Sequence, residues 1–161
     1  MEKVLTNKIL LIQFVSLAGI AFLAPFLGHQ ILTGTIVNAV LFTTVSLLGI
    51  QAALIVSFMP SMIALLVGVL PVFLAPMIPY IIISNMILVV SFHYLKERYW
   101  LAIIVSSFLK FSFLFLSSFA IINLFLSNNQ VPLIMSWNQL FTALAGGALF
   151  LIWKSIKTKI S

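Results

Sequence analysis

One lysine lies in the middle of a long apolar stretch, where its charge needs an explanation. Residues 99–125 are apolar over the length of a bilayer crossing, apart from several serines, Asn123 and Lys110. A charged side chain at membrane depth costs at least about 2.5–3.5 kcal/mol on insertion scales, and such residues often mark a ligand or ion site. Lys110 is therefore the first candidate for chemistry in this chain.

The chemistry open to Lys110 depends on what balances its charge. The two acidic residues, Glu2 and Glu97, both lie outside the apolar stretches, so no carboxylate at membrane depth can pair with the ammonium group. This favours an anionic ligand as the counter-charge, with Ser106 and Ser117 on the same helical face. The alternative is structural, in that Lys110 snorkels towards headgroups or binds backbone carbonyls of a neighbouring helix.

Amide side chains lie at related depths in three other apolar stretches. Asn85 is about nine residues into its predicted helix, at roughly the depth of Lys110, and Asn38 lies one to two turns from the outer end of its own. Further candidates occupy the first two turns of the last helix: Trp137, Asn138 and Gln139. Hydrogen bonding between helices, worth about 0.6 kcal/mol on average, explains each amide singly. Together they predict a pocket open to the outside, in which the tryptophan stacks on a ring and the amides bind its edges.

Several classes of function find no support in the residue types. The chain has no cysteine, no Ser-His-Asp set, no paired carboxylates and no phosphate-binding glycine loop. His29 and His93 are predicted near opposite faces of the membrane and cannot share a metal. We therefore expect no enzyme activity, no metal site and no cofactor. With no acid inside the membrane, coupling to protons or sodium through carboxylates is not supported either.

The composition predicts the elements that must position these residues. The chain has 161 residues, of which 63% are hydrophobic and 6% charged, as in an integral membrane protein. Residues 33–68 carry no charge, and as one helix they would be about 54 Å long. They are predicted to form two helices turning near residues 49–51, or one helix plus a re-entrant segment. The sequence thus predicts one all-α domain over residues 1–161, with transmembrane helices at about 8–27, 33–48, 51–68, 76–94, 99–125 and 132–153.

The cations outside residue 110 predict the orientation of this six-helix bundle. They flank the apolar spans in three groups: Lys3 and Lys8, Lys96 and Arg98, and Lys154, Lys157 and Lys159. Six spans place all three groups on one side, which the positive-inside rule makes the cytoplasmic side. Both termini are therefore expected in the cytoplasm. The net charge of +6 is explained by topology and does not indicate a nucleic-acid partner.

Small residues on the first predicted helix form a second feature. Ala18, Ala21 and Ala24 follow one another at a spacing of three, and Ala24 and Gly28 form a pair four apart. Small residues let helices approach closely. Packing within the bundle and docking of a partner protein both remain open for this face.

Taken together, these features resemble a known family. Six short hydrophobic helices in about 160 residues, with both termini inside and small residues on the first helix, resemble the substrate-binding S components of energy-coupling factor (ECF) transporters. Three segments are similar to small bacterial proteins grouped with that family: TGTIVNA at 33–39, LAPMIPYIIISN at 74–85 and MSWNQLFTALAGG at 135–147. The docking motif of the family places alanines four apart on the first helix, and here only the pair Ala24 and Gly28 has that spacing.

The resemblance implies a function and partners. It implies capture of a vitamin-like micronutrient at the bacterial cytoplasmic membrane, with a transmembrane coupling subunit and two ATPase subunits as partners. The chain itself has no nucleotide-binding motif. The alternative of another class is a small anion channel or an oligomeric membrane scaffold, in which Lys110 lines a path or an interface.

Overall fold

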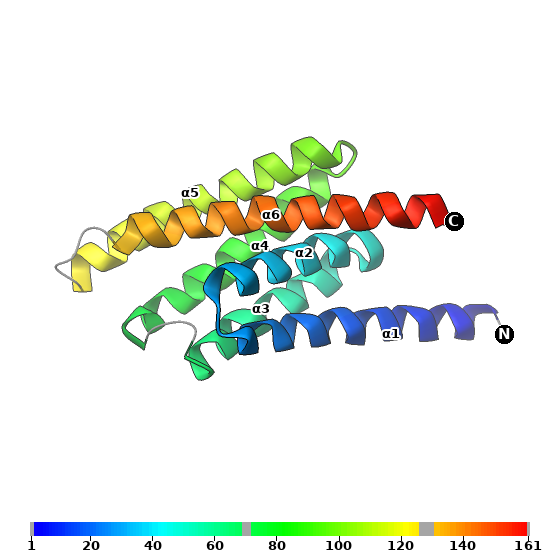
Figure 1. The fold of residues 1–161 in the computed structure, drawn as a ribbon, viewed down its shortest axis with the longest axis horizontal. Coiled ribbons are helices and arrows are strands. Elements are labelled where there is room, and N and C mark those ends of the chain that lie inside the picture. Colours follow the sequence, from blue (N-terminus) through cyan, green and yellow to red (C-terminus); the bar gives the residue numbers. More distant parts are fainter. Residues whose placement is uncertain (1, 69–71, 126–130, 161) are drawn as a thin grey trace.

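Helices account for the fold of residues 2–68, 72–125 and 131–160, the part of the chain that our computed structural model describes. Side chains are placed for residues 7–68, 75–120 and 137–159. The α-helices are α1 (Glu2–Leu23), α2 (Gln30–Leu48), α3 (Ile50–Leu66), α4 (Ile78–Leu95), α5 (Tyr99–Phe125) and α6 (Val131–Ile160). Two 3₁₀ helices are η1 (Ala24–Leu27) and η2 (Val72–Met77). The predicted all-α bundle of six helices is confirmed (Figure 1).

Five of the described helices are long and apolar enough to cross a membrane, and α3 is a shorter apolar helix. With 17 residues, α3 spans about 25 Å. Large apolar side chains such as Leu11 and Ile12 on α1 are exposed on the outside of the bundle. Such a surface suits a lipid environment. The chain is therefore a multi-span helical membrane protein.

The uncharged stretch of residues 33–68 folds as two helices. Gly49 alone separates α2 from α3, with a φ of 86°, a backbone conformation that favours glycine.

Two further boundaries follow from proline. The first helix changes to the 3₁₀ helix η1 at Ala24 because Pro25 lacks a backbone N–H. The predicted helix from residue 76 begins instead at Ile78, after Pro76 within η2.

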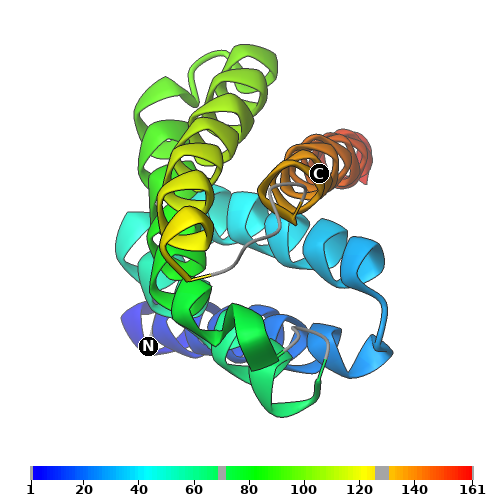
Figure 2. The same cartoon turned by 90° about the vertical axis from the view of Figure 1, so that its left-hand side faces the viewer.

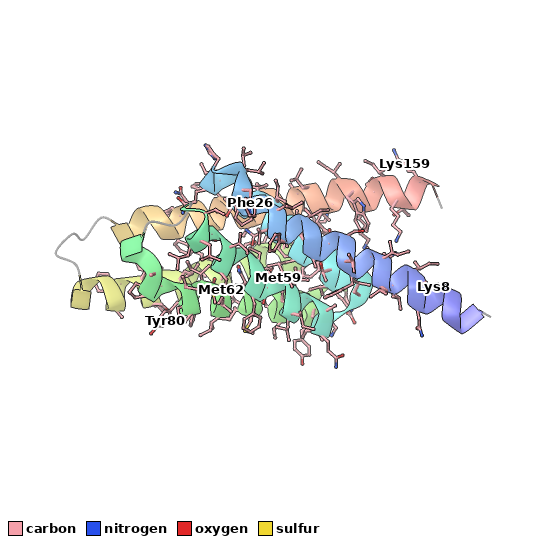
Figure 3. All side chains as sticks on the ribbon, turned by 90° about the horizontal axis from the view of Figure 1, so that it is seen from below. Lys8, Phe26, Met59, Met62, Tyr80 and Lys159 are labelled. Carbon is pink, nitrogen blue, oxygen red and sulfur yellow. The ribbon has the colours of Figure 1, made fainter. Side chains whose placement is uncertain are left out.

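The helices alternate in direction, so that the two termini lie at the same end of the bundle (Figure 1). We call this the termini end, and it also holds the α2–α3 turn and the α4–α5 turn. Figure 3 shows Lys8 and Lys159 there. The common end of the termini is what six spans require. That it faces the cytoplasm stays a prediction of the positive-inside rule.

Helices α2, α4, α5 and α6 form the centre of the bundle. Helix α2 packs along α6, and α5 packs against both α4 and α6 (Figure 2). The crossing of α2 and α6 is close because Gly146 has no side chain. A Cβ there would lie 2.7 Å from the backbone nitrogen of Ala39 and 2.8 Å from the backbone oxygen of Thr35. This crossing brings the side chain of Asn38 to the centre of the bundle.

Aromatic rings fill the interior near the termini end. Phe42, Phe92 and Phe150 are fully buried, with ring centroids 4.7 Å apart for Phe42 and Phe92 and 5.5 Å apart for Phe92 and Phe150. The ring of Tyr99 lies 5.8 Å from that of Phe150. We call these four residues the aromatic cluster. It closes the interior on this side by dense packing.

The three alanines of the first predicted helix face the bundle. Ala18, Ala21 and Ala24 belong to the hydrophobic core, and α1 packs against α2 and α3. Gly28 is exposed and has a φ of 67° after η1. Packing within the bundle therefore accounts for the three alanines, and the docking role of this face stays a prediction.

Candidate functional site

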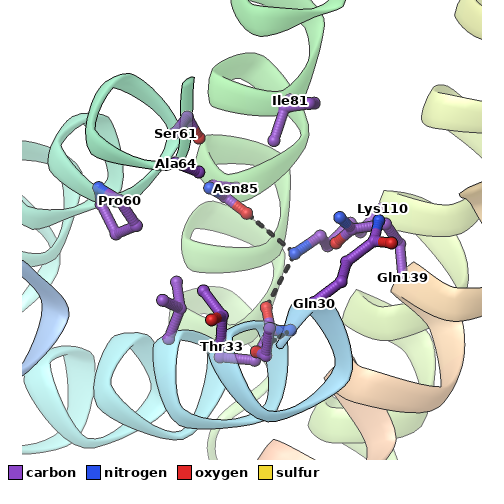
Figure 4. A pocket seen from close by; sticks show the side chains of 12 residues that line it. Gln30, Thr33, Pro60, Ser61, Ala64, Ile81, Asn85, Lys110 and Gln139 are labelled. Carbon is purple, nitrogen blue, oxygen red and sulfur yellow. Dashed lines mark hydrogen bonds between the residues drawn. The ribbon is translucent and has the colours of Figure 1, made fainter. Parts of the chain in front are cut away.

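Lys110 lies in the middle of α5 with 1% of its surface exposed. Its Nζ donates hydrogen bonds to Oδ1 of Asn38 at 2.7 Å and to Oδ1 of Asn85 at 2.8 Å (Figure 4). Asn38 comes from α2 and Asn85 from α4. The ammonium group is thus held by two neutral amides of neighbouring helices.

The amide groups are themselves held with their oxygens towards the lysine. Nδ2 of Asn38 donates to the backbone oxygen of Gly34 at 2.8 Å and to Oγ1 of Thr142 at 3.4 Å. Nδ2 of Asn85 donates to the backbone oxygen of Ser57 at 3.4 Å. Since both NH₂ groups have acceptors elsewhere, the carbonyl ends are free to face Nζ. These bonds connect α2, α3, α4, α5 and α6 around one charge.

A cavity begins at Lys110 (Figure 4). Its lining reaches Gln30, the first residue of α2, at the end of the bundle opposite the termini. Its volume is about 70 Å³, room for several waters or a small chemical group. The lining residues are Gln30, Thr33, Gly34, Val37, Asn38, Pro60, Ser61, Ala64, Ile81, Asn85, Lys110 and Gln139. They come from five helices. Among these described residues, Lys110 carries the one charge.

The described part of the chain does not use the full hydrogen-bonding capacity of Lys110. An ammonium group has three donors, and the described residues accept two of them. Because Lys110 also lines the cavity, its third donor is available to whatever occupies that space. The nearest acid in the sequence, Glu97, lies in the turn before α5, thirteen residues or about 20 Å along the chain from Lys110. Among the residues whose side chains the structure describes, the charge of Lys110 therefore has no partner of opposite sign.

The structure brings together half of the residues predicted to bind a ligand. Lys110, Asn38 and Asn85 are hydrogen-bonded, and Gln139 lines the same cavity. Asn138 is half-buried on α6 but is not among the described lining residues.

The other predicted site residues lie away from the cavity. Trp137 is 47% exposed, and its ring packs 5.2 Å from that of Phe111, on a face of α6 that it shares with Phe141. The ring-stacking role predicted for it has no support in this placement. Ser106 and Ser117 donate to backbone oxygens of their own helix, at 3.2 Å and 2.7 Å. These intrahelical bonds explain why neither hydroxyl reaches the cavity.

Sequence reasoning overlooked most of the polar lining on α2. Gln30, Thr33, Gly34, Val37 and Asn38 follow the spacing of one helical face, and all of them line the cavity. This spacing was visible in the sequence and could have identified the face. The hydroxyl of Ser61 on α3 carried no comparable signal, since an isolated serine is common in transmembrane helices.

Comparisons of the chain with protein-family models, with curated proteins and with solved structures found no match. The resemblance to ECF S components therefore rests on architecture and on the segments quoted above. The chain is a multi-span helical membrane protein, and a function for it has to be inferred from the chemistry of its cavity.

Proposed function

We propose that this protein captures a small anionic micronutrient in the cavity that begins at Lys110. One observation carries the proposal: a fully buried ammonium group, held in place by two amide oxygens, faces a cavity lined by no described acid. In a low-dielectric interior, the attraction between this charge and an anion is much stronger than in water. Binding an anion would also supply the missing counter-charge.

The amides suit the role of positioning groups. Their oxygens stabilise the ammonium group while the cavity is empty and fix the direction of its remaining donor. A carboxylate or similar oxyanion then accepts a charge-assisted hydrogen bond from Nζ. Gln139 and Ser61 add neutral hydrogen-bonding groups along the wall. The cavity is thus more suited to an anion than to a cation.

The size of the cavity limits what binds wholly inside it. About 70 Å³ is well below the roughly 300–1,000 Å³ of sites that enclose drug-sized ligands. The anionic group of the solute would lie at Lys110, and the rest of a larger solute would extend towards the open end. The described lining has no aromatic ring to stack on a ligand ring. The cavity therefore supports an anionic ligand more than a ring-containing one.

The uptake role and its partners follow from the resemblance to S components. In that scheme a transmembrane coupling subunit and two ATPase subunits deliver the captured solute to the cytoplasm. Three observations support it: six helices, termini at a common end, and a cavity that extends from mid-bundle towards the other end. Co-purification of an ATPase complex with the tagged protein from its native membranes tests this part separately from ligand binding.

Two rival functions, an anion channel and a membrane scaffold, make different demands on the structure. A channel would need a path along the bundle, and the buried rings of Phe42, Phe92 and Phe150 lie across it. A scaffold role has direct support in the hydrogen bonds that Lys110 makes to α2 and α4. In that case Lys110 holds the helices together and binds no solute.

The test is a titration of the purified protein with acetate, lactate, nicotinate, chloride and phosphate, for the wild type, Lys110→Met and the control Lys157→Met. Lys157 is exposed near the end of α6. We expect Lys110→Met to weaken binding of the best anion about thirtyfold or more, and the control to leave it unchanged. Equal binding by Lys110→Met and wild type would refute the site. A lysine variant that loses its folded state, beside a wild type that binds no anion, would instead favour the scaffold.

A further inference from the structure

A second hollow lies between the start of α5 and the end of α6, at the termini end of the bundle. Its volume is about 880 Å³. It is lined by Glu97, Arg98, Tyr99, Trp100, Leu101, Ile104, Leu151, Lys154, Ser155 and Thr158. We call it the α5–α6 groove. None of these residues belongs to the cavity at Lys110, so the two features are independent.

The lining of the groove changes along the helix axes. Arg98, Lys154, Ser155 and Thr158 lie at its outer end, beside the α4–α5 turn and the last turns of α6. Leu101, Ile104 and Leu151 lie deeper along the same helices. Ile104 is about 9 Å further along α5 than Arg98. The groove thus passes from cations and hydroxyls to apolar side chains over the distance that separates headgroups from acyl chains.

No residue that the structure describes covers the apolar part of the groove fully. Leu101 is 50% and Ile104 56% exposed. In a membrane, such side chains on the outside of a bundle contact lipid. Trp100 is exposed beside them, as expected of an aromatic side chain at the level of the headgroups. This part of the groove therefore suits an acyl chain.

The polar part of the groove selects the headgroup. Lys154 is held between the two helices, with its Nζ 2.8 Å from the centroid of the Tyr99 ring. Its ammonium group and the guanidinium of Arg98 line the same hollow, together with the hydroxyls of Ser155 and Thr158. Cations and hydroxyls of this kind bind phosphate oxygens. Glu97 opposes this charge, so that the groove holds two cations and one carboxylate.

We propose that the α5–α6 groove is a binding site for an anionic phospholipid. The phosphate lies at Arg98 and Lys154, and one acyl chain runs along Leu101, Ile104 and Leu151. Charge complementarity and the continuous path from polar to apolar lining identify this occupant. Basic pockets between transmembrane helices are an established way of recognising anionic headgroups.

The test is native mass spectrometry of the whole protein with equal amounts of phosphatidylglycerol and phosphatidylcholine that have the same acyl chains. We expect the wild type to retain phosphatidylglycerol preferentially, and the double variant Arg98→Gln/Lys154→Gln to lose that preference at least fivefold. The control Lys157→Gln/Lys159→Gln removes the same charge outside the groove and should keep the preference. Ser155→Glu, which leaves every cation in place, should lower it, and Glu97→Gln should raise it.

Three results would overturn the proposal. One is a wild type without preference for phosphatidylglycerol. Another is an equal loss in the groove variant and its control, which would mean attraction to diffuse surface charge. In the third, inorganic phosphate displaces phosphatidylglycerol as effectively as a second anionic lipid does. That result would make free phosphate the ligand. The variant Lys110→Met should retain phosphatidylglycerol whether or not the cavity at Lys110 binds an anion. The lipid proposal and the proposed function can therefore fail independently of each other.

Discussion

The two ends of the bundle interior are built by different means. Towards the termini, the aromatic cluster fills the centre with rings whose centroids lie 4.7 to 6.2 Å apart. Around Lys110, the same helices carry amides and a charge, and a cavity of about 70 Å³ remains. Phe42 lies one turn beyond Asn38 on α2, and Phe92 lies two turns beyond Asn85 on α4. The change in character therefore occurs within two turns.

Different forces stabilise the two regions. Rings stabilise the bundle by contacts that act in every direction, so their loss leaves a void. The polar region depends on a few directed hydrogen bonds, which hold side chains in place while leaving space beside them. Stability is thus expected to reside mainly in the aromatic cluster, and binding in the polar region. Substitutions in each region can separate the two.

The largest effect on stability is expected for Phe92→Ala. Phe92 is fully buried and contacts the rings of Phe42, Tyr99 and Phe150. Removing its ring creates a cavity, and we expect a loss of about 3 kcal/mol in the free energy of unfolding. Unfolding by SDS in mixed micelles measures it. Anion affinity of the variant that remains folded should be unchanged.

A matched control for this substitution is Phe108→Ala, on the lipid-facing side of α5. Phe108 is 58% exposed, so detergent or lipid can fill the space that its ring leaves. The expected change is within about 0.5 kcal/mol. If both variants lost the same stability, ring burial in the cluster would not be what stabilises this end of the bundle.

The next effect connects the two regions through the crossing of α2 and α6. In Gly146→Ala, the added Cβ meets backbone atoms of Thr35 and Ala39 and the Cβ of Asn38, at 2.7–2.8 Å. Backbone atoms cannot move aside without separating the helices, and we expect a loss of about 2 kcal/mol in stability. Because Asn38 must shift as well, anion affinity should fall in the same variant.

Gly19→Ala provides the contrast within another helix. A Cβ at Gly19 meets nothing within 4 Å, and alanine favours a helix over glycine by about 0.5–1 kcal/mol. The free energy of unfolding should therefore stay constant or rise. A Gly146→Ala protein as stable as wild type would show that α2 and α6 can separate freely at Asn38.

Much of the fold was predictable because several of the described helix boundaries have a local cause. Gly49 ends α2, Pro76 precedes α4, and residues 96–98 form the charged turn before α5. Depth along the helices placed Asn85 level with Lys110, and the two are in fact hydrogen-bonded. Helix boundaries and depths along a helix are determined by residues close by in the chain, so they can be predicted from the sequence.

The rotation of each helix about its axis was harder to predict. Trp137 was expected in the pocket, yet it faces outward while Gln139, two residues on, lines the cavity. The rotation of α6 is fixed by Thr142 and Gly146 packing on α2, more than one hundred residues away in the sequence. Apolar residues on all sides of a transmembrane helix give no periodic pattern that reveals such a contact.

The substitution that separates binding from stability most clearly is Asn85→Asp. It replaces an amide by a carboxylate of the same shape, 2.8 Å from Nζ of Lys110, and thus supplies the counter-charge inside the protein. The lost bond from Nδ2 to the oxygen of Ser57 is long, at 3.4 Å, so little stability is lost with it. A charge-assisted bond to Lys110 replaces a neutral one, and stability should be equal or higher.

Anion affinity, measured by titration, should fall about tenfold or more, because the carboxylate competes with the ligand for the ammonium group. Asn138→Asp makes the same change outside the described lining and should leave the affinity unaltered. If Lys110 serves only to hold helices together, Asn85→Asp would strengthen the bundle and leave any anion binding as it was.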